Sequence, residues 1–100
     1  MLVQFSLFPV GEKSLTKPVS RIIDIIDRSG LPYQTTAMGT LVEGNYDEIF
    51  KLIKRCHNAL KKSHDRIYGV IKLDDRKGAK GRLKGKVNSV EKALGRKIKR

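Results

Sequence analysis

Hydrophobic and polar residues alternate over the first ten positions of the chain. In an extended strand they would fall on opposite faces, namely Val3, Phe5 and Leu7 against Gln4, Ser6 and Phe8. A period of two is typical of a strand with one buried face. We therefore predict a strand over 2–10 that ends near Pro9, because proline cannot donate a hydrogen bond to a neighbouring strand.

Two later segments change to the helical period of 3.6 residues. The first follows the candidate N-caps Ser14 and Thr16 and stops at Gly30, and the second follows Asn45 and Glu48, which have the spacing of a capping box. Each segment therefore predicts an amphipathic helix. The two apolar stripes are Val19, Ile22, Ile23 and Ile26, and then Tyr46, Ile49, Phe50, Ile53, Cys56, His57 and Leu60.

Three further stretches favour strands because they are rich in β-branched and aromatic residues. They are 31–38, 40–43 after a turn at Gly39, and 66–73. The resulting order β-α-β-β-α-β predicts an α+β, ferredoxin-like sandwich, in which two helices cover one face of a four-stranded antiparallel sheet. The other face of that sheet would be bare.

The basic charge is concentrated at the C-terminal end. Residues 1–75 hold 11 Lys and Arg against 9 Asp and Glu, whereas residues 76–100 hold 11 against Glu91 alone. Val87, Val90 and Leu94 are at helical spacing in this segment. We predict a ferredoxin-like domain over 1–76, with a basic linker and C-terminal helix over 77–100 that belong to the same domain.

Several functional classes lack the residues that they need. The single Cys56 cannot form an internal disulfide, which favours a cytoplasmic location, and no Cys/His cluster predicts a metal site. No nucleophile lies beside a recognisable base, so the sequence does not indicate an enzyme. The predicted third strand, GTLVEG, has none of the aromatic residues on which an RNA-recognition motif stacks bases.

Four segments together resemble the small thiamine-binding proteins related to YkoF. They are FSLFPVG, AMGTLVEG followed by NYDEIF, IKLDDRKG, and VNSVEKAL, in that order along nearly the whole chain. The resemblance implies a ferredoxin-like fold and homo-oligomers built by sheet pairing, as dimers or tetramers. It also implies non-catalytic binding of thiamine or its hydroxymethylpyrimidine part as a ligand, with no cofactor.

The resemblance extends to candidate ligand-binding residues. Ser6, Met38, Thr40 and Glu43 match the family's pattern, and we add Thr36 because it lies close by in the predicted hairpin. Thiamine combines a flat aminopyrimidine with a cationic thiazolium. A site for it needs apolar walls, a few hydrogen-bonding groups and preferably a carboxylate, which Glu43 would supply.

Each of these residues also has a simpler interpretation. Glu43 is equally suited to an exposed ion pair with a lysine, Met38 to turn packing, and Ser6 to a subunit interface. Two other functions also stay open. The basic tail would allow contact with nucleic acid or another polyanion, an alternative that we do not favour over ligand binding, and the bare sheet face would suit a plain oligomeric scaffold.

Overall fold

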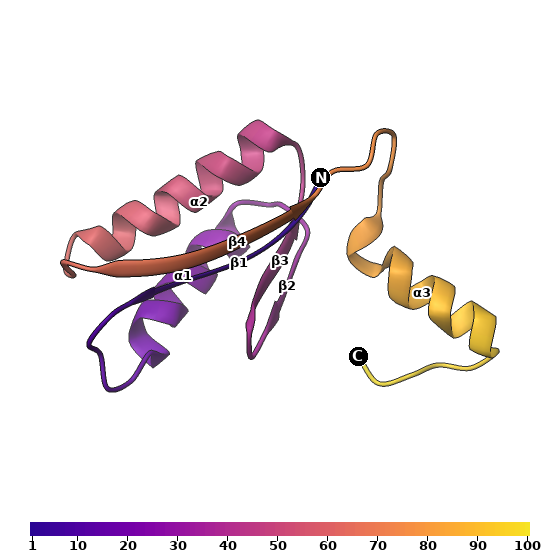
Figure 1. Ribbon diagram of the computed structural model, residues 1–100, viewed down its shortest axis with the longest axis horizontal. Coiled ribbons are helices and arrows are strands. Elements are labelled where there is room, and N and C mark those ends of the chain that lie inside the picture. The colour runs from indigo at the N-terminus through magenta and orange to yellow at the C-terminus, as the bar shows by residue number, and fades with distance from the viewer.

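The computed structural model describes residues 1–100 and has one four-stranded sheet with three helices (Figure 1). All neighbouring strands are antiparallel, in the order β2-β3-β1-β4. The predicted α+β, ferredoxin-like fold is therefore confirmed. The strands are β1 (Leu2–Pro9), β2 (Tyr33–Thr36), β3 (Gly39–Glu43) and β4 (Ile67–Asp74).

The three helices are α1 (Thr16–Arg28), α2 (Tyr46–Lys61) and α3 (Arg82–Leu94). Helices α1 and α2 lie side by side across one face of the sheet, whereas α3 stands apart from this sandwich (Figure 1). None of the three helices combines the length and the hydrophobicity that a membrane-spanning helix requires.

The core lies between the sheet and the two packed helices. Val3 and Phe5 of β1 and Val42 of β3 are at most 2% exposed, as the alternating pattern predicted for β1. Burial of an aliphatic or aromatic side chain of this kind contributes about 1.5–3 kcal/mol. The helices add Ile22, Ile26, Ile49, Leu52, Ile53, Cys56 and Leu60.

The two helix starts differ in how well the sequence predicted them. The capping box at Asn45 and Glu48 is present, with Glu48 N–H donating to Asn45 Oδ1 at 2.8 Å. The prediction of a Ser14 or Thr16 cap for α1 is wrong. Leu15 occupies the N-cap position and no side chain caps the helix. The Ser14 hydroxyl contacts Thr16 alone, accepting from its N–H at a long 3.4 Å and donating to its hydroxyl at 3.3 Å.

The sheet face opposite the helices is uncovered, as the fold predicted. Tyr68 and Val70 on this face are 51% and 44% exposed. Strand β4 is also an edge strand, with β1 as its only neighbour, and none of its residues is fully buried. An apolar sheet edge of this length is a surface on which further strands pair.

The predicted C-terminal helix is present as α3, and it has no buried residue. Gly81 and Gly95 lie at its two ends with φ of +64° and +73°, a conformation that glycine adopts without steric cost. Only Gly85 lies inside the helix. The division of the domain at 76/77 stays a prediction.

Candidate functional site

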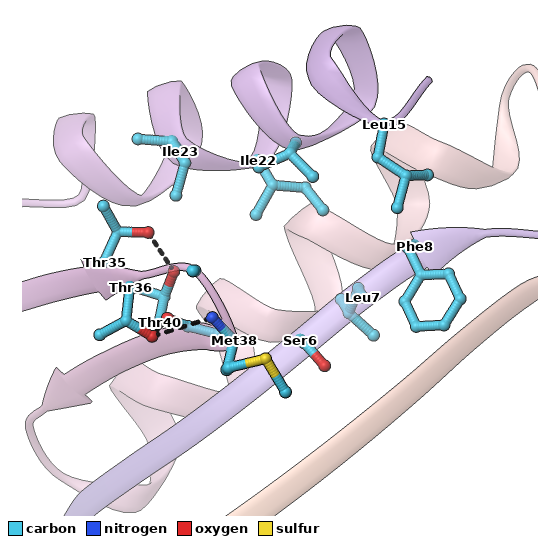
Figure 2. Close-up of a pocket in the computed structure, with 13 residues that line it drawn as sticks. Ser6, Leu7, Phe8, Leu15, Ile22, Ile23, Thr35, Thr36, Met38 and Thr40 are labelled. Carbon is cyan, nitrogen blue, oxygen red and sulfur yellow. Dashed lines mark hydrogen bonds between the residues drawn. The ribbon is translucent and has the colours of Figure 1, made fainter. Parts of the chain in front are cut away.

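A cavity of about 310 Å³ opens between α1, the middle of β1 and the β2–β3 hairpin (Figure 2). The hairpin forms one wall, β1 a second, and the first two turns of α1 a third. Its lining residues are Ser6, Leu7, Phe8, Leu15, Val19, Ile22, Ile23, Thr35, Thr36, Ala37, Met38, Gly39 and Thr40. We call it the α1–hairpin cavity.

The cavity exists because β1 extends beyond the end of β3, its neighbour on one side. Strand β3 pairs with 2–5 only, ending at Phe5 opposite Thr40, while β4 pairs with β1 as far as Pro9. Backbone N–H and C=O groups of 6–8 that point away from β4 therefore have no strand partner. These groups lie on the cavity wall, where a ligand with donors and acceptors in one plane would complete the ladder.

Gly39 allows the hairpin to approach β1 closely. Its φ is +153°, and a Cβ at this position would lie 3.1 Å from the backbone oxygen of Phe5. A side chain here would be strained and would push the hairpin away from β1. The glycine therefore sets the width of the cavity at its inner end.

Hydroxyl groups supply the polar part of the lining. The Thr35 and Thr40 hydroxyls are 3.1 Å apart, and Thr40 is only 5% exposed. The Thr36 hydroxyl donates to Gly39 O at 2.9 Å and accepts from Met38 N–H at 3.1 Å, so it holds the turn (Figure 2). The Ser6 hydroxyl makes no hydrogen bond within the chain.

The apolar part of the lining is unusually exposed at the rim. Leu15 and Val19 of α1 are 39% and 40% exposed, and Met38 is 84% exposed. On the opposite rim the Phe8 ring packs against that of Tyr68, with 5.5 Å between centroids. Exposed apolar side chains around a cavity indicate that a ligand or partner covers them.

No charged residue lines the α1–hairpin cavity. Its hydrogen-bonding capacity comes from neutral hydroxyls and from the backbone. This composition suits an uncharged, flat, polar ring better than a cation, because a buried cation without a counter-charge carries a large desolvation cost.

The structure places Glu43 away from this cavity. Side chains alternate along a strand, so Thr40 and Glu43, three residues apart, point to opposite faces of the sheet. The two Glu43 oxygens accept from Arg82 N–H at 2.9 Å and Leu83 N–H at 3.1 Å. Glu43 therefore caps the start of α3 from a distant strand.

The same contacts set the ionisation of this carboxylate. Desolvation raises the pKa of Glu43, but the N–H groups of Arg82 and Leu83 stabilise the charged form, and the net pKa is below its usual value. Beside it, Arg82 forms an ion pair with Asp74 at the end of β4, which lowers the pKa of Asp74. Glu43 and Asp74 together anchor the N-terminus of α3 to the sheet.

Four of the five predicted site residues meet in one place. Ser6, Thr36, Met38 and Thr40 all line the α1–hairpin cavity, and Glu43 does not. The sequence reasoning missed Leu15 and Val19. Leu15 carried no periodic signal, and Val19 was assigned to the core because its helical spacing does not distinguish a cavity wall from a packed face.

The lining of the α1–hairpin cavity offers neutral hydroxyls and apolar side chains as binding groups. No group of three or more His, Cys, Asp or Glu side chains is arranged to hold a metal ion. The one thiol, Cys56, is buried in the core, and desolvation raises its pKa to about 11, so it is protonated at neutral pH. The fold and the cavity thus define a ferredoxin-like α+β domain with an uncharged, ligand-sized cavity.

Comparison with known proteins gives the family. Residues 3–91 match the family model described as thiamine-binding protein, so the chain belongs to the thiamine-binding protein family. This membership assigns it a thiamine-related role and confirms the resemblance seen in the sequence.

Several relatives match over nearly their whole length. UPF0045 protein MJ1052 of Methanocaldococcus jannaschii is 31% identical over 90% of this chain and 91% of its own length. UPF0045 protein Mb1933 of Mycobacterium bovis is 36% identical, covering 94% of each chain. The crystal structure of MJ1052 superimposes with a TM-score of 0.81, covering 89% of this chain and 93% of the other.

A second solved structure supports the fold alone. A Thermotoga maritima protein, assigned provisionally to thiamine biosynthesis or salvage, superimposes with a TM-score of 0.79 at 24% identity. The match covers 89% of this chain and 96% of that protein.

Proposed function

We propose that the protein binds thiamine, without transforming it, by holding the aminopyrimidine ring in the α1–hairpin cavity. The observation that carries this proposal is an uncharged cavity with a free strand edge and neutral hydroxyls in a member of the thiamine-binding protein family. The ring would lie against the apolar α1 wall. The thiazolium would stay at the open rim, where its charge remains solvated.

The aminopyrimidine presents an amine donor beside a ring-nitrogen acceptor in one plane. The N–H and C=O of Leu7, which point away from β4 beyond the end of β3, offer the complementary donor and acceptor. Thr40 lines the cavity from the helix-covered face of the sheet and Ser6 from the opposite face. A cavity of about 310 Å³ is at the lower end of the range for small-molecule sites, roughly 300–1,000 Å³, which suits a single ring better than the whole vitamin.

Glu43 is not a ligand contact in this proposal. Its carboxylate is held by the N-terminus of α3, so it does not act as a counter-ion in the cavity. We retain Ser6, Thr36, Met38 and Thr40 as contact residues. Met38, at the rim, would close over the bound ring.

The test is calorimetric titration of thiamine into protein that has been unfolded and refolded to remove carried-over ligand. We expect saturable heat, and a Thr40→Val variant should weaken the affinity at least about tenfold through loss of one buried hydroxyl. Ser89→Ala, on the exposed face of α3, is the matched control and should bind normally. An absence of heat at millimolar thiamine would contradict the proposal.

We further propose that the working form is a cytoplasmic homo-oligomer, a dimer or a tetramer. The support is the bare apolar face around Tyr68 and Val70 and the unpaired edge of β4. Val70→Lys should lower the mass measured by light scattering, whereas Lys72→Gln on the same face should not. A monomeric unmodified protein would refute this part alone.

Contact with polyanions through α3 is the second candidate. It is favoured because α3 stands off the sandwich, and of the eleven Lys and Arg residues in 76–100 only Arg82 and Arg100 form ion pairs. Binding of a labelled 20-nucleotide RNA should then fall steeply with salt and with the triple change Lys84→Gln, Lys86→Gln and Lys92→Gln.

A further inference from the structure

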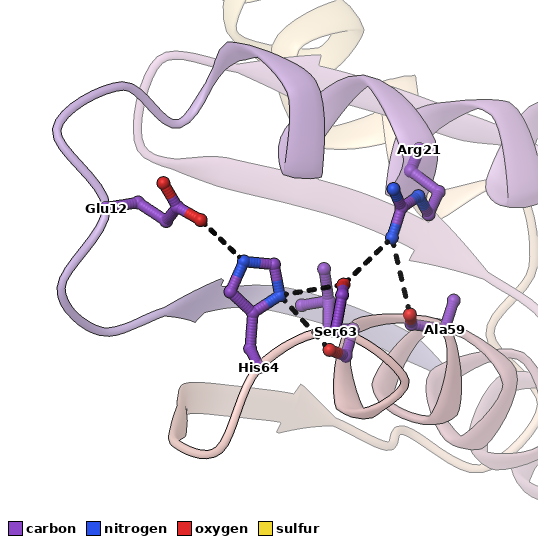
Figure 3. Close-up of polar contacts among 6 residues, drawn as sticks. Glu12, Arg21, Ala59, Ser63 and His64 are labelled. Atoms are coloured by element: carbon purple, nitrogen blue, oxygen red, sulfur yellow. Dashed lines mark hydrogen bonds and ion pairs between the residues drawn. The ribbon is translucent and has the colours of Figure 1, made fainter.

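A second cavity, of about 640 Å³, lies on the other side of α1. It is bounded by the loop after β1, by the first two turns of α1 and by the C-terminal end of α2 (Figure 3). None of its nine lining residues is hydrophobic. We call it the α1–α2 cleft. It shares no lining residue with the α1–hairpin cavity.

Three cationic side chains line this cleft without a carboxylate partner. Lys13, Lys17 and Arg21 are spaced four residues apart, and none of them belongs to the four ion pairs of the structure. Arg21 reaches across to α2, where its Nη1 lies 3.5 Å from both Ala59 O and Ser63 Oγ. Like charges gathered around an open space repel one another and favour an anion between them.

The only acidic residue of the cleft is already paired. Glu12 Oε1 accepts from His64 Nε2 at 2.7 Å, and His64 Nδ1 lies 3.2 Å from Leu60 O and 3.1 Å from Ser63 Oγ (Figure 3). This chain of contacts ties the loop that carries Lys13 to the end of α2. Glu12 and His64 are therefore positioning residues that shape the cleft.

Neutral donors complete the lining. Ser14, Thr16 and Ser63 present hydroxyls, and α1 begins here with neither a side-chain cap nor an acidic residue in its first turn. The Lys17 N–H makes no hydrogen bond within the chain. Fixed donors and three cations around a polar space are the elements of oxyanion recognition.

We propose that the α1–α2 cleft binds a diphosphate group, either free or carried by an organic ester. The negative charge of a diphosphate is similar in size to the combined positive charge of Lys13, Lys17 and Arg21. A cleft of about 640 Å³ is also larger than a single phosphate needs. Arg21 suits bidentate contact with one phosphate, while the lysines act as mobile charges on the other.

The test is calorimetric titration at low salt with inorganic diphosphate and, separately, with ADP. We expect saturable binding of about one per chain. The triple variant Lys13→Gln, Lys17→Gln and Arg21→Gln should weaken it about 20- to 100-fold, because each charge-assisted contact contributes a several-fold effect. Circular dichroism should show unchanged folding, and Lys17→Gln alone gives a second, milder variant.

The matched control removes the same charge elsewhere. Lys51→Gln, Lys54→Gln and Arg55→Gln on the exposed face of α2, outside the cleft, should leave diphosphate affinity within about twofold. An equal loss in both triple variants, or no saturable heat with diphosphate or ADP, would overturn the proposal. Tighter binding of ADP than of diphosphate would assign an ester as the ligand, and tighter binding of diphosphate would assign the free anion.

The two proposals fail independently. The cleft triple variant should bind thiamine as the unmodified protein does, because none of its three side chains lines the α1–hairpin cavity. Loss of thiamine binding in that variant would show instead that the two sites are one.

Discussion

The two cavities beside α1 differ in almost every respect although one helix lines both. The α1–hairpin cavity has apolar walls and neutral hydroxyls, whereas the α1–α2 cleft has no hydrophobic residue and collects three cations. Val19 faces the first and Arg21 the second, two residues apart on the helix. An amphipathic helix that covers one face of a sheet can thus serve two sites of opposite chemistry.

The largest effect is expected from a substitution in the hydrophobic core that supports both cavities. Phe5→Ala deletes a core side chain that is 2% exposed beneath both α1 and α2. We expect a loss of about 3–5 kcal/mol in the free energy of unfolding, measured by urea denaturation. Thiamine and diphosphate binding should weaken together, and loss of only one would mean that the cavities do not depend on a common core.

The second prediction tests whether a change in the α1–hairpin cavity leaves the α1–α2 cleft unaffected. Gly39→Ala adds a Cβ that would meet Phe5 O at 3.1 Å in a strained backbone conformation. We expect about 1–3 kcal/mol of destabilisation and a thiamine affinity reduced about tenfold, because the hairpin wall moves. Diphosphate affinity should stay within twofold. A parallel loss of diphosphate binding would show that the hairpin also supports the cleft.

The third prediction concerns Glu43, which lines neither cavity. Its pKa is lowered in the folded protein, so its contribution is complete above its ordinary value of 4.5 and is lost as the pH falls through the lower folded value. The protection factors of the α3 amides, which correct for the intrinsic exchange rate, should therefore fall at acid pH, and Glu43→Gln, by analogy with a lost cap, should cost about 1 kcal/mol. Thiamine binding should be unchanged; a tenfold loss would place this carboxylate at the ligand.

The smallest effect is expected from the contact that shapes the cleft. His64→Ala removes the hydrogen bond to Glu12 and loosens the loop that carries Lys13. We expect diphosphate affinity to fall about three- to fivefold, the scale of one exposed charged contact, with unaltered thiamine binding in the same titrations. Unchanged diphosphate binding would show that the cleft does not need this contact.

Features that depend on residues close in the chain were predicted from the sequence, and contacts between distant residues were not. The buried positions Val3, Phe5 and Ile26 and the capping box at Asn45 were predictable because they depend on residues close in the chain. The partner of Glu43 was not, because it lies 39 residues away at Arg82. An isolated carboxylate indicates that a donor is needed, and it does not indicate which one.

The sequence by itself determined the order of the elements, the α+β class and the faces that form the core, since periods of two and 3.6 are local properties of the backbone. The tertiary structure alone decided where β3 stops along β1, and therefore that a cavity opens beside Ser6. It also brought Arg21 to Ser63 and Lys13 to the end of α2. Register and packing between distant segments depend on the whole fold, so no local pattern records them.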